Sequence, residues 1–159
     1  MRKYRVYNDK IINIKNEEDE YMKVKKAGTI LLNLQNKQIG LVYREDKKDY
    51  SFPKGHLEKG ETLQECAVRE TEEETMRANH LLINKEVYIL KYTTEVNKDI
   101  ECYMYISIDD GNTERNIDLI DRENLKWINY EDVGDVLSYE NLKELWEKIK
   151  EPIKSILNN

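Results

Sequence analysis

The sequence contains little glycine, proline or cysteine and has no long hydrophobic run. Its 159 residues include six glycines, two prolines and two cysteines. Cys66 and Cys102 are far apart and lack CxxC spacing, which excludes a disulfide scaffold and a cysteine zinc site and suits a reducing compartment. The longest apolar stretch, Ile30–Leu32, is far too short to span a membrane. Because no apolar signal core follows the basic residues 1–5, we expect a soluble protein of the cytoplasm.

A strong positive charge is also missing. The chain has 26 basic and 32 acidic residues and a net charge of −6. Such a chain has no general attraction for nucleic acid or anionic lipid, so we expect neither as a partner, and any phosphate it binds must be held locally, through a cation. Hydrophobic residues make up 39% and recur in periodic blocks, which is typical of a folded chain, and the length fits one domain.

Periodic apolar residues predict five strands and two helices. The strands are expected at residues 23–34, 38–44, 86–94, 101–108 and 125–128. Residues 109–123 are expected to form a polar loop, and 62–76 a central helix. Ser138 is the expected N-cap of a closing helix whose core stripe is Leu142, Leu145, Trp146, Ile149, Ile153 and Ile156. These elements predict an α/β protein with a mixed sheet between helices.

Three of the eight glycine and proline residues fall within ten positions, at Pro53, Gly55 and Gly60. A loop that takes so many of these residues has a backbone shape that ordinary residues do not readily adopt, although an ordinary strand-to-helix turn is the alternative. Thr62 and Glu65 then form the capping-box pattern, which fixes the start of the central helix.

The central helix carries a run of carboxylates. At about 100° per residue, Glu70, Glu73 and Glu74 share one arc, whereas Glu72 points roughly opposite. Like charges at these spacings destabilise a helix by about 0.2–0.5 kcal/mol per pair, and the helix dipole disfavours them near the C-terminal end. A hard divalent cation bound to the arc compensates this repulsion. The alternative is a solvated acidic face.

The loop and helix together resemble the Nudix box. Gly55, five residues, Glu61, seven residues and then Arg69-Glu70-Thr71-Glu72-Glu73-Glu74 have its spacing. The resemblance extends over residues 23–157, and it implies a Nudix-type α/β/α sandwich. We therefore expect a Nudix hydrolase domain over 23–159, preceded by an extension of unclear role over 1–22, where a short strand around 4–14 is possible.

Other segments refine the resemblance. Residues 52–56 look like the diadenosine tetraphosphate hydrolase branch in particular, and 125–132 resemble the strand and turn before the family's last helix. The box expects glycine where Met76 stands and an aliphatic residue where Arg77 stands. Since methionine disfavours the left-handed conformation in which that glycine ends the helix, we expect the helix to continue toward Ala78.

The resemblance implies a metal-dependent hydrolase that cleaves a pyrophosphate linkage in a nucleoside diphosphate-linked substrate, with dinucleoside polyphosphates as first choice. Mg²⁺ or Mn²⁺ is the implied cofactor. Glu70, Glu73 and Glu74, with the Gly55 carbonyl, are the implied metal ligands, and Glu73 is the best candidate to orient water. Arg69 belongs to the implied catalytic set and, with Glu61, forms an ion pair between loop and helix. Gly60 has a structural part in the motif.

Several assignments stay open at this point. Lys54, His56 and Arg44 are candidates for holding substrate phosphates, and the candidates for stacking on a base are Tyr43, Tyr50, Tyr103 and Tyr105. The family often adds an acid from a loop opposite the box, for which the candidates are Glu114, Asp121 and Glu123. A nucleoside triphosphate or nucleotide-sugar pyrophosphatase, or a non-catalytic nucleotide-binding domain, are the alternatives. Monomer and homodimer are equally compatible with the sequence.

Overall fold

A computed structural model describes residues 3–7, 10–14, 22–83, 85–117 and 123–159, and side chains are described for 23–83, 85–117 and 124–159. Ten strands form one sheet. In chain order the strands and helices are β1 (Lys3–Tyr7), β2 (Lys10–Ile14), β3 (Met22–Asn33), β4 (Gln38–Arg44), β5 (Asp49–Ser51), β6 (Lys54–His56), α1 (Leu63–Thr75), β7 (Arg77–Leu81), β8 (Tyr88–Thr93), β9 (Lys98–Asn112), β10 (Glu123–Asn129), the 3₁₀ turn η1 (Tyr130–Asp132), α2 (Val133–Val136) and α3 (Glu140–Leu157).

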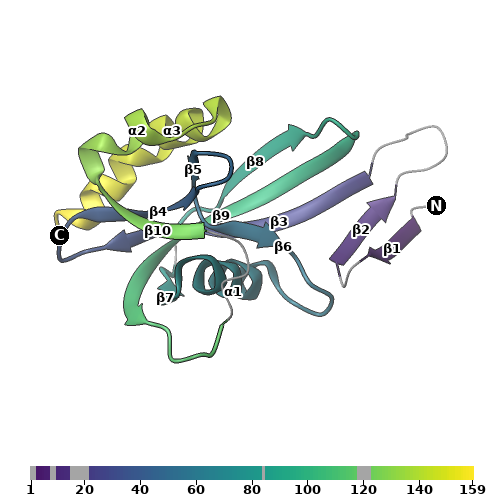
Figure 1. Ribbon diagram of the computed structural model, residues 1–159, viewed down its shortest axis with the longest axis horizontal. Helices are drawn as coiled ribbons and strands as arrows, with labels where there is room; N and C mark the ends of the chain where they lie inside the picture. Colours follow the sequence, from purple (N-terminus) through teal and green to yellow (C-terminus); the bar gives the residue numbers. More distant parts are fainter. Residues whose placement is uncertain (1–2, 8–9, 15–21, 84, 118–122) are drawn as a thin grey trace.

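The strand β3 is the centre of the sheet. It runs parallel to β9 over all but its last residue, from Met22 opposite Lys98 to Leu32 opposite Ile108. Its other edge pairs in succession with β2, β6 and β4, all antiparallel. The sheet is therefore mixed, as the sequence predicts. The hairpin of β1 and β2 extends it at the end away from α3 (Figure 1).

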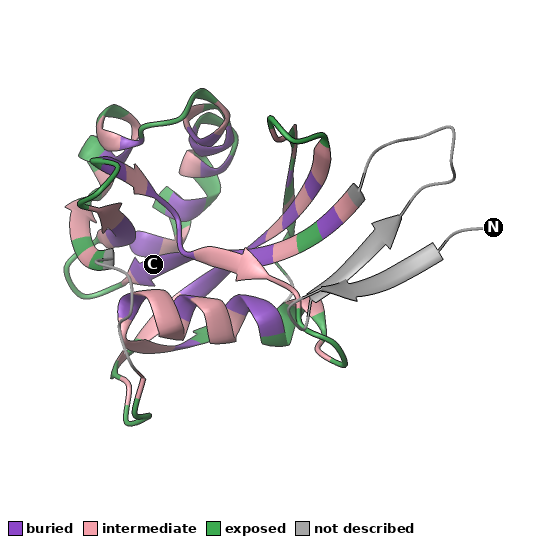
Figure 2. Cartoon of the chain, turned by 45° about the vertical axis from the view of Figure 1, so that its right-hand side comes forward, coloured by how far each residue is buried: buried purple, intermediate pink, exposed green. Residues whose placement is uncertain are grey.

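Helices cover both faces of the sheet, so the α/β/α sandwich is confirmed. α1 lies on one face and α2 with α3 on the other (Figure 1). Buried residues gather along the central strands between these layers (Figure 2). The predicted stripe of α3 packs into the larger core cluster, with Leu142, Leu145, Trp146, Ile149 and Ile153 buried and Ile156 partly buried. Among the described residues, no helix has both the length and the apolar character that crossing a bilayer requires.

The prediction for the end of α1 is wrong. The helix ends at Thr75, and Met76 is the C-cap in the left-handed region, with φ 61° and ψ 26°. Its backbone N–H donates to the Glu72 carbonyl over 2.8 Å. The next residue already begins β7, which pairs antiparallel with β9 from Arg77 opposite Asn112. The sheet pairing of β7 therefore forces the turn at a residue whose own preference is helical.

Two further predictions need correction. The predicted polar loop 109–123 is shorter at both ends, because β9 continues to Asn112 and β10 begins at Glu123. Ser138 is not the N-cap of α3, since Tyr139 holds that position and makes no side-chain cap. The Ser138 hydroxyl instead accepts a hydrogen bond from the Tyr50 backbone N–H, 2.8 Å away.

Candidate active site

The loop between β5 and α1 is fastened to β3 by backbone hydrogen bonds. The Thr29 N–H donates to the Pro53 carbonyl over 3.1 Å, and the Leu57 N–H donates to the Lys25 carbonyl over 3.0 Å. Such close approach requires glycine at position 28, because a methyl group there would overlap the Pro53 carbonyl oxygen. The glycine- and proline-rich loop is therefore held against the centre of the sheet.

The start and the seating of α1 follow from side-chain hydrogen bonds. The capping box is present in both directions, between Thr62 and Glu65, as the sequence predicts. Two buried hydroxyls, of Thr29 on β3 and Thr71 on α1, lie 2.8 Å apart and join the helix to the sheet. The rotation of α1 about its axis, and with it the direction of its carboxylates, is thereby fixed.

Arg69 connects the loop to the carboxylates of α1. Its guanidinium forms a two-point ion pair with Glu61, at 2.6 and 3.0 Å, which confirms the pairing expected from the sequence. Nη1 donates to both Glu70 and Glu73, at 3.0 Å each. Nη2 also donates to the His56 carbonyl, 3.0 Å away. Burial alone would raise the pKa of Glu61, but the hydrogen bonds from Arg69 and the Glu58 backbone N–H, together with the charge of Arg69, hold that pKa below the usual value of a glutamate.

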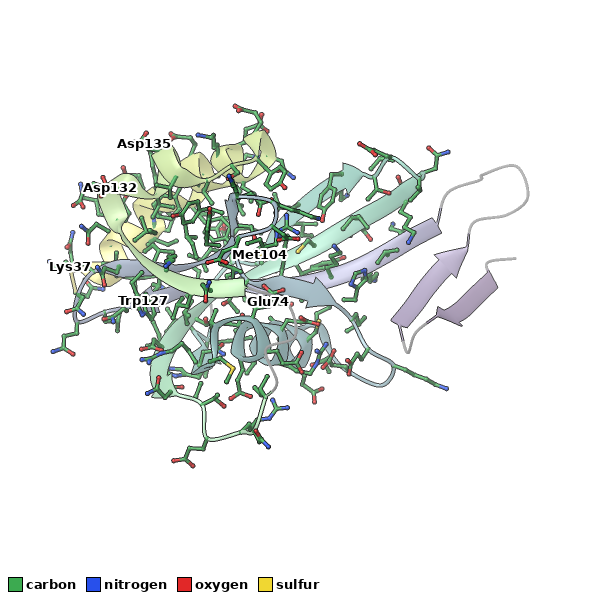
Figure 3. The ribbon with its side chains drawn as sticks, viewed as in Figure 1. Lys37, Glu74, Met104, Trp127, Asp132 and Asp135 are labelled. Atoms are coloured by element: carbon green, nitrogen blue, oxygen red, sulfur yellow. The ribbon has the colours of Figure 1, made fainter. Side chains whose placement is uncertain are left out.

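Gly55 leaves room for the Glu70 carboxylate. A methyl group at position 55 would overlap the carboxyl carbon and an oxygen of Glu70. The Glu70 side chain is 14% exposed, so its carboxylate lies against the β6 backbone rather than in bulk water. Glu74, one turn further along, accepts a hydrogen bond from the Lys54 N–H over 3.3 Å and lies where α1 faces the sheet (Figure 3). The two carboxylates therefore face the same loop.

A pocket of about 400 Å³ opens beside this loop. Glu70 and Glu74 line it together with Gly55, so three of the four predicted metal ligands lie at one pocket. Basic side chains line the same space, and they come from three strands: Lys26, Arg44, Lys54 and His56. The structure thus brings all three predicted phosphate-binding residues to the pocket that contains the carboxylates.

Glu73 and Arg69 stand outside the lining of this pocket. Glu73 has a side chain that is 37% exposed and reaches the pocket acids only through the shared Arg69. Within the described part of the chain, no three acidic, histidine or cysteine side chains are gathered around a common point as metal ligands are. Glu70 and Glu73 instead both accept hydrogen bonds from the Arg69 guanidinium, while Glu74 accepts one from the Lys54 backbone N–H.

Glu72 points away from the pocket, as its helical position predicts. It accepts hydrogen bonds from the Thr113 hydroxyl at 3.0 Å and from the Arg115 guanidinium. Its side chain is only 15% exposed, so its carboxylate is held by these two partners rather than solvated. Glu114, between these two partners, is exposed and does not line the pocket. Asp121 and the side chain of Glu123 lie outside the described residues.

The departure from the Nudix box at Arg77 has a structural partner. Its guanidinium forms a two-point ion pair with Asp109 on β9, at 2.7 Å for both bonds, and also donates to Asn112. The guanidinium carbon lies 5.9 Å from the ring centroid of Trp127 on β10. Arg77 therefore fastens the strand after α1 to its neighbours, on the side of the helix away from the pocket.

Sequence reasoning missed four pocket residues: Lys26, Val42, Ser51 and Tyr139. It also missed Asp49, which lies outside the pocket lining and pairs with Arg44 by two hydrogen bonds. Ser51 and Lys26 occupy ordinary strand positions, where no local pattern distinguishes them. Tyr139 follows Glu74, the last glutamate of the box, by 65 positions and reaches the pocket only through the fold. No sequence signal identifies it.

The tyrosines and cysteines take packing positions. Tyr103 and Tyr105 pack with α1 against the smaller core cluster, and the rings of Tyr43 and Tyr50 lie 4.7 Å apart. Both cysteines are buried and unpaired by disulfide. Burial raises the pKa of Cys66 to about 12 and that of Cys102 to about 11, so both thiols stay protonated at neutral pH.

The donor set fits a hard divalent cation. Carboxylate and carbonyl oxygens are the ligands that Mg²⁺ and Mn²⁺ prefer. Glu70 and Glu74 supply two carboxylates to one pocket, and the missing side chain at Gly55 opens space beside the first of them. Gly55 is paired with Ala27 in the sheet, and its carbonyl is also contacted by the weakly donating Cys66 thiol at 3.7 Å.

Known proteins share this architecture. The NUDIX domain family model matches residues 22–154. A binary complex of the C. elegans Ap4A hydrolase superimposes with a TM-score of 0.66 at 23% identity and covers 83% of this chain and 98% of its own. A Nudix hydrolase from Nitrosomonas europaea gives 0.66 at 16% identity, covering 82% and 90%, and RenU from M. smegmatis gives 0.60 at 14%, covering 84% and 88%.

The family match covers the box, the sheet around it and most of the closing helix. It coincides with the intact arginine and glutamates of α1 and with the pocket that they border. The chain therefore belongs to the Nudix family and is a pyrophosphohydrolase of that family.

Proposed function

We propose that this chain is a divalent-metal-dependent hydrolase of nucleoside diphosphate-linked substrates, with dinucleoside polyphosphates as the first choice. One observation carries the proposal. The pocket is lined both by carboxylates from α1 and by basic side chains from β3, β4 and β6. Carboxylates are typical ligands of a divalent metal ion, and several basic side chains together can bind a ligand that has several phosphates. The fold shared with an Ap4A hydrolase is compatible with this substrate class.

The proposed metal ligands are Glu70, Glu73 and Glu74, with the Gly55 carbonyl as a further donor. A divalent cation bound there, Mg²⁺ or Mn²⁺, would neutralise phosphate charge and make a bound water more acidic. Arg69 holds Glu70 and Glu73 by the same guanidinium nitrogen, so it sets the direction of both carboxylates. Glu73 is the more exposed of the two and is our candidate for orienting the attacking water.

The basic side chains have distinct proposed roles. Lys54 is adjacent to Gly55 and lies nearest to the carboxylates, since its backbone N–H donates a hydrogen bond to the Glu74 carboxylate. We assign it and His56 to the phosphate at the point of cleavage. Arg44 lies on β4, across the pocket, and is assigned to a phosphate further along the chain. Lys26 is added to this set from its position in the pocket lining.

Product analysis tests the proposal. The protein is incubated with a dinucleoside tetraphosphate, a nucleoside triphosphate and a nucleotide sugar, each with Mg²⁺ and with EDTA, and products are separated by ion exchange. We expect the tetraphosphate to be cleaved with the highest kcat/KM, and only with metal. Preferred cleavage of either other substrate would replace the first choice by the corresponding pyrophosphatase.

A non-catalytic nucleotide-binding domain is the alternative from another class. It would bind nucleotides without producing any cleavage product. The intact set of Arg69, Glu70, Glu73 and Glu74 favours turnover. We also propose that residues 23–159 form the hydrolase domain and that residues 1–22 are an extension to it, with the β1–β2 hairpin paired to the first residues of β3.

A further inference from the structure

Three side chains form a hydrogen-bonded cluster on the side of the pocket opposite α1. Arg44 Nε donates to one oxygen of Asp49 over 2.8 Å, and its Nη2 donates to the other oxygen. Tyr139 joins both partners: its hydroxyl donates to Asp49 and accepts from Arg44 Nη2 over 3.1 Å. Arg44 and Tyr139 both line the pocket. The cluster unites β4, β5 and the start of α3.

The cluster is built to hold the arginine in one orientation. Asp49 is 5% exposed, so its carboxylate is removed from competing water. Its hydrogen bonds with Arg44 hold the pKa of Asp49 below its usual value, and the carboxylate is charged at neutral pH. Tyr139 is itself fixed, because the preceding Ser138 exchanges hydrogen bonds with the backbone of Tyr50, at 2.8 and 3.3 Å.

The hydrogen-bond inventory of Arg44 leaves one nitrogen available. A guanidinium has five N–H donors, one on Nε and two on each Nη. Asp49 and Tyr139 occupy the donor on Nε and both donors on Nη2. Among the described residues, none accepts a hydrogen bond from Nη1. The two N–H groups of Nη1 therefore form the available end of an arginine whose other end is fixed.

We propose that Asp49 and Tyr139 are positioning residues, which fix the guanidinium of Arg44. Its Nη1 then binds an outer phosphate of the substrate, one that lies outside the pyrophosphate linkage that is cleaved. This inference rests on the proposed function, since it assigns part of the same pocket to an outer phosphate. An arginine held by a carboxylate loses less side-chain entropy when it binds an anion than a mobile one does. Lys54 and the carboxylates lie on the other side of the pocket, so the chain of phosphates would run from α1 toward β4.

A second arginine pair provides a matched control. Arg77 and Asp109 form the same two-point ion pair, and their side chains are 22% and 10% exposed, against 28% and 7% for Arg44 and Asp49. Arg77 lies outside the pocket lining. Asp49→Asn and Asp109→Asn therefore remove equivalent carboxylates, and only the first acts on the pocket.

The first experiment measures binding without turnover. Inorganic tripolyphosphate is titrated into the wild type and the variants Asp49→Asn, Tyr139→Phe, Arg44→Lys and Asp109→Asn by calorimetry in EDTA. We expect Kd to rise about fivefold or more for the three pocket variants, as when a hydrogen bond to a charged group is weakened, and to stay unchanged for Asp109→Asn. Equal affinity of Asp49→Asn and the wild type would overturn the proposal, as would a failure of the wild type to bind tripolyphosphate.

The second experiment separates a positioning role from a structural one. For Tyr139→Phe, which keeps the ring and removes only the hydroxyl, KM for a dinucleoside tetraphosphate should rise about fivefold with kcat nearly unchanged. KM for a dinucleoside diphosphate, which has no outer phosphate, should not change. A fall in kcat with both substrates would overturn the proposal. If nothing is hydrolysed, the proposed function fails, while the tripolyphosphate titration still decides the role of Asp49.

Discussion

Glu72, Glu73 and Glu74 are adjacent and chemically identical, yet each contacts a different part of the molecule. Glu72 binds Thr113 and Arg115, Glu73 binds Arg69, and Glu74 lies at the pocket beside Lys54. The difference follows from the 100° step of the helix alone. Composition cannot separate the three residues, whereas helix geometry can.

Substitution by glutamine tests this separation because it keeps the shape and removes the charge. In Glu73→Gln and Glu74→Gln we expect kcat/KM to fall about a hundredfold or more, since a metal ligand is lost. In Glu72→Gln we expect kcat/KM to stay nearly unchanged. The variants are assayed at saturating Mg²⁺ with one dinucleoside tetraphosphate.

The contacts of Glu72 also predict that Glu72→Gln loses some stability. Its bonds to Thr113 and Arg115 should be weakened by glutamine, at a cost of about 0.5–1 kcal/mol in the free energy of unfolding. Urea denaturation measures this cost. An activity loss in Glu72→Gln equal to that of its neighbours would mean that the carboxylate faces are wrongly assigned.

The ion pair of Glu61 with Arg69 predicts a dependence of stability on acid. Because the pKa of Glu61 is lower in the folded than in the unfolded chain, the folded state binds fewer protons. The stabilisation from this ion pair is complete above the pKa of Glu61 in the unfolded chain, and it is lost as the pH falls through the lower pKa of the folded chain. The free energy of unfolding of Glu61→Gln should thus fall less steeply with acid than that of the wild type.

Urea denaturation from pH 6 to 3 checks this expectation. Glu95→Gln is the matched control, since Glu95 lies exposed in the turn between β8 and β9 and its loss also removes one charge. The control should follow the wild-type curve. Parallel curves for Glu61→Gln and Glu95→Gln would contradict the assignment.

At the scale of elements, the end of α1 places a methionine where glycine is favoured. The left-handed conformation costs a residue with a side chain about 1–2 kcal/mol, and glycine adopts it freely. We expect Met76→Gly to raise the free energy of unfolding by about 1 kcal/mol despite the greater entropy of glycine in the unfolded chain.

Met76→Ala is the control for this prediction, because it removes the same side chain and leaves the strained backbone. It should give no gain in urea denaturation, so the difference between the two variants isolates the backbone term. Equal stability of the glycine and alanine variants would show that the left-handed turn at position 76 carries no strain.

The elements that the sequence predicts well are those with a local cause. The capping box fixed the start of α1, and the apolar stripe identified α3, because both are properties of neighbouring residues. The end of α1 was predicted wrongly, since it depends on the pairing of Arg77 with Asn112, 35 positions later in the chain. Ser138 has the composition of an N-cap, but its hydroxyl is used by Tyr50, which only the fold brings near.

The candidate site divides in the same way. Glu70, Gly55, Lys54 and His56 lie in or beside one continuous motif, and the resemblance of that motif to a known family pointed to them. Asp49 and Tyr139 belong to hydrogen bonds between distant segments, and a single sequence contains no pattern that joins them. The prediction therefore recovered the side of the pocket built by α1 and β6 and missed the partners of Arg44 on the other side.

Metal binding should raise the stability of the folded chain as a whole. A cation that binds only the folded state stabilises it by mass action, by about 2.7 kcal/mol at a hundredfold excess over Kd. For a chain of this length we expect Mg²⁺ to raise Tm by about 5–10 °C and EDTA to abolish turnover. Differential scanning calorimetry with and without Mg²⁺ measures the shift.

Glu72→Gln should keep the full shift in Tm, and Glu74→Gln should lose most of it. Full activity in EDTA would remove the metal from the mechanism. A shift in Tm without any turnover would favour the non-catalytic nucleotide-binding alternative.

The parallel pairing of β3 with β9 has a consequence for how the chain reaches its fold. β3 ends at Asn33 and β9 begins at Lys98, so the pocket loop and α1 lie within the long connection between two central strands. Closing a loop of this size is slow, because its entropy is lost before the parallel contacts form. During synthesis on the ribosome, α1 emerges before the strand that completes the sheet beneath it. The candidate site is therefore completed late, because β3, to which α1 is joined through Thr29, lacks its parallel partner until β9 has been made.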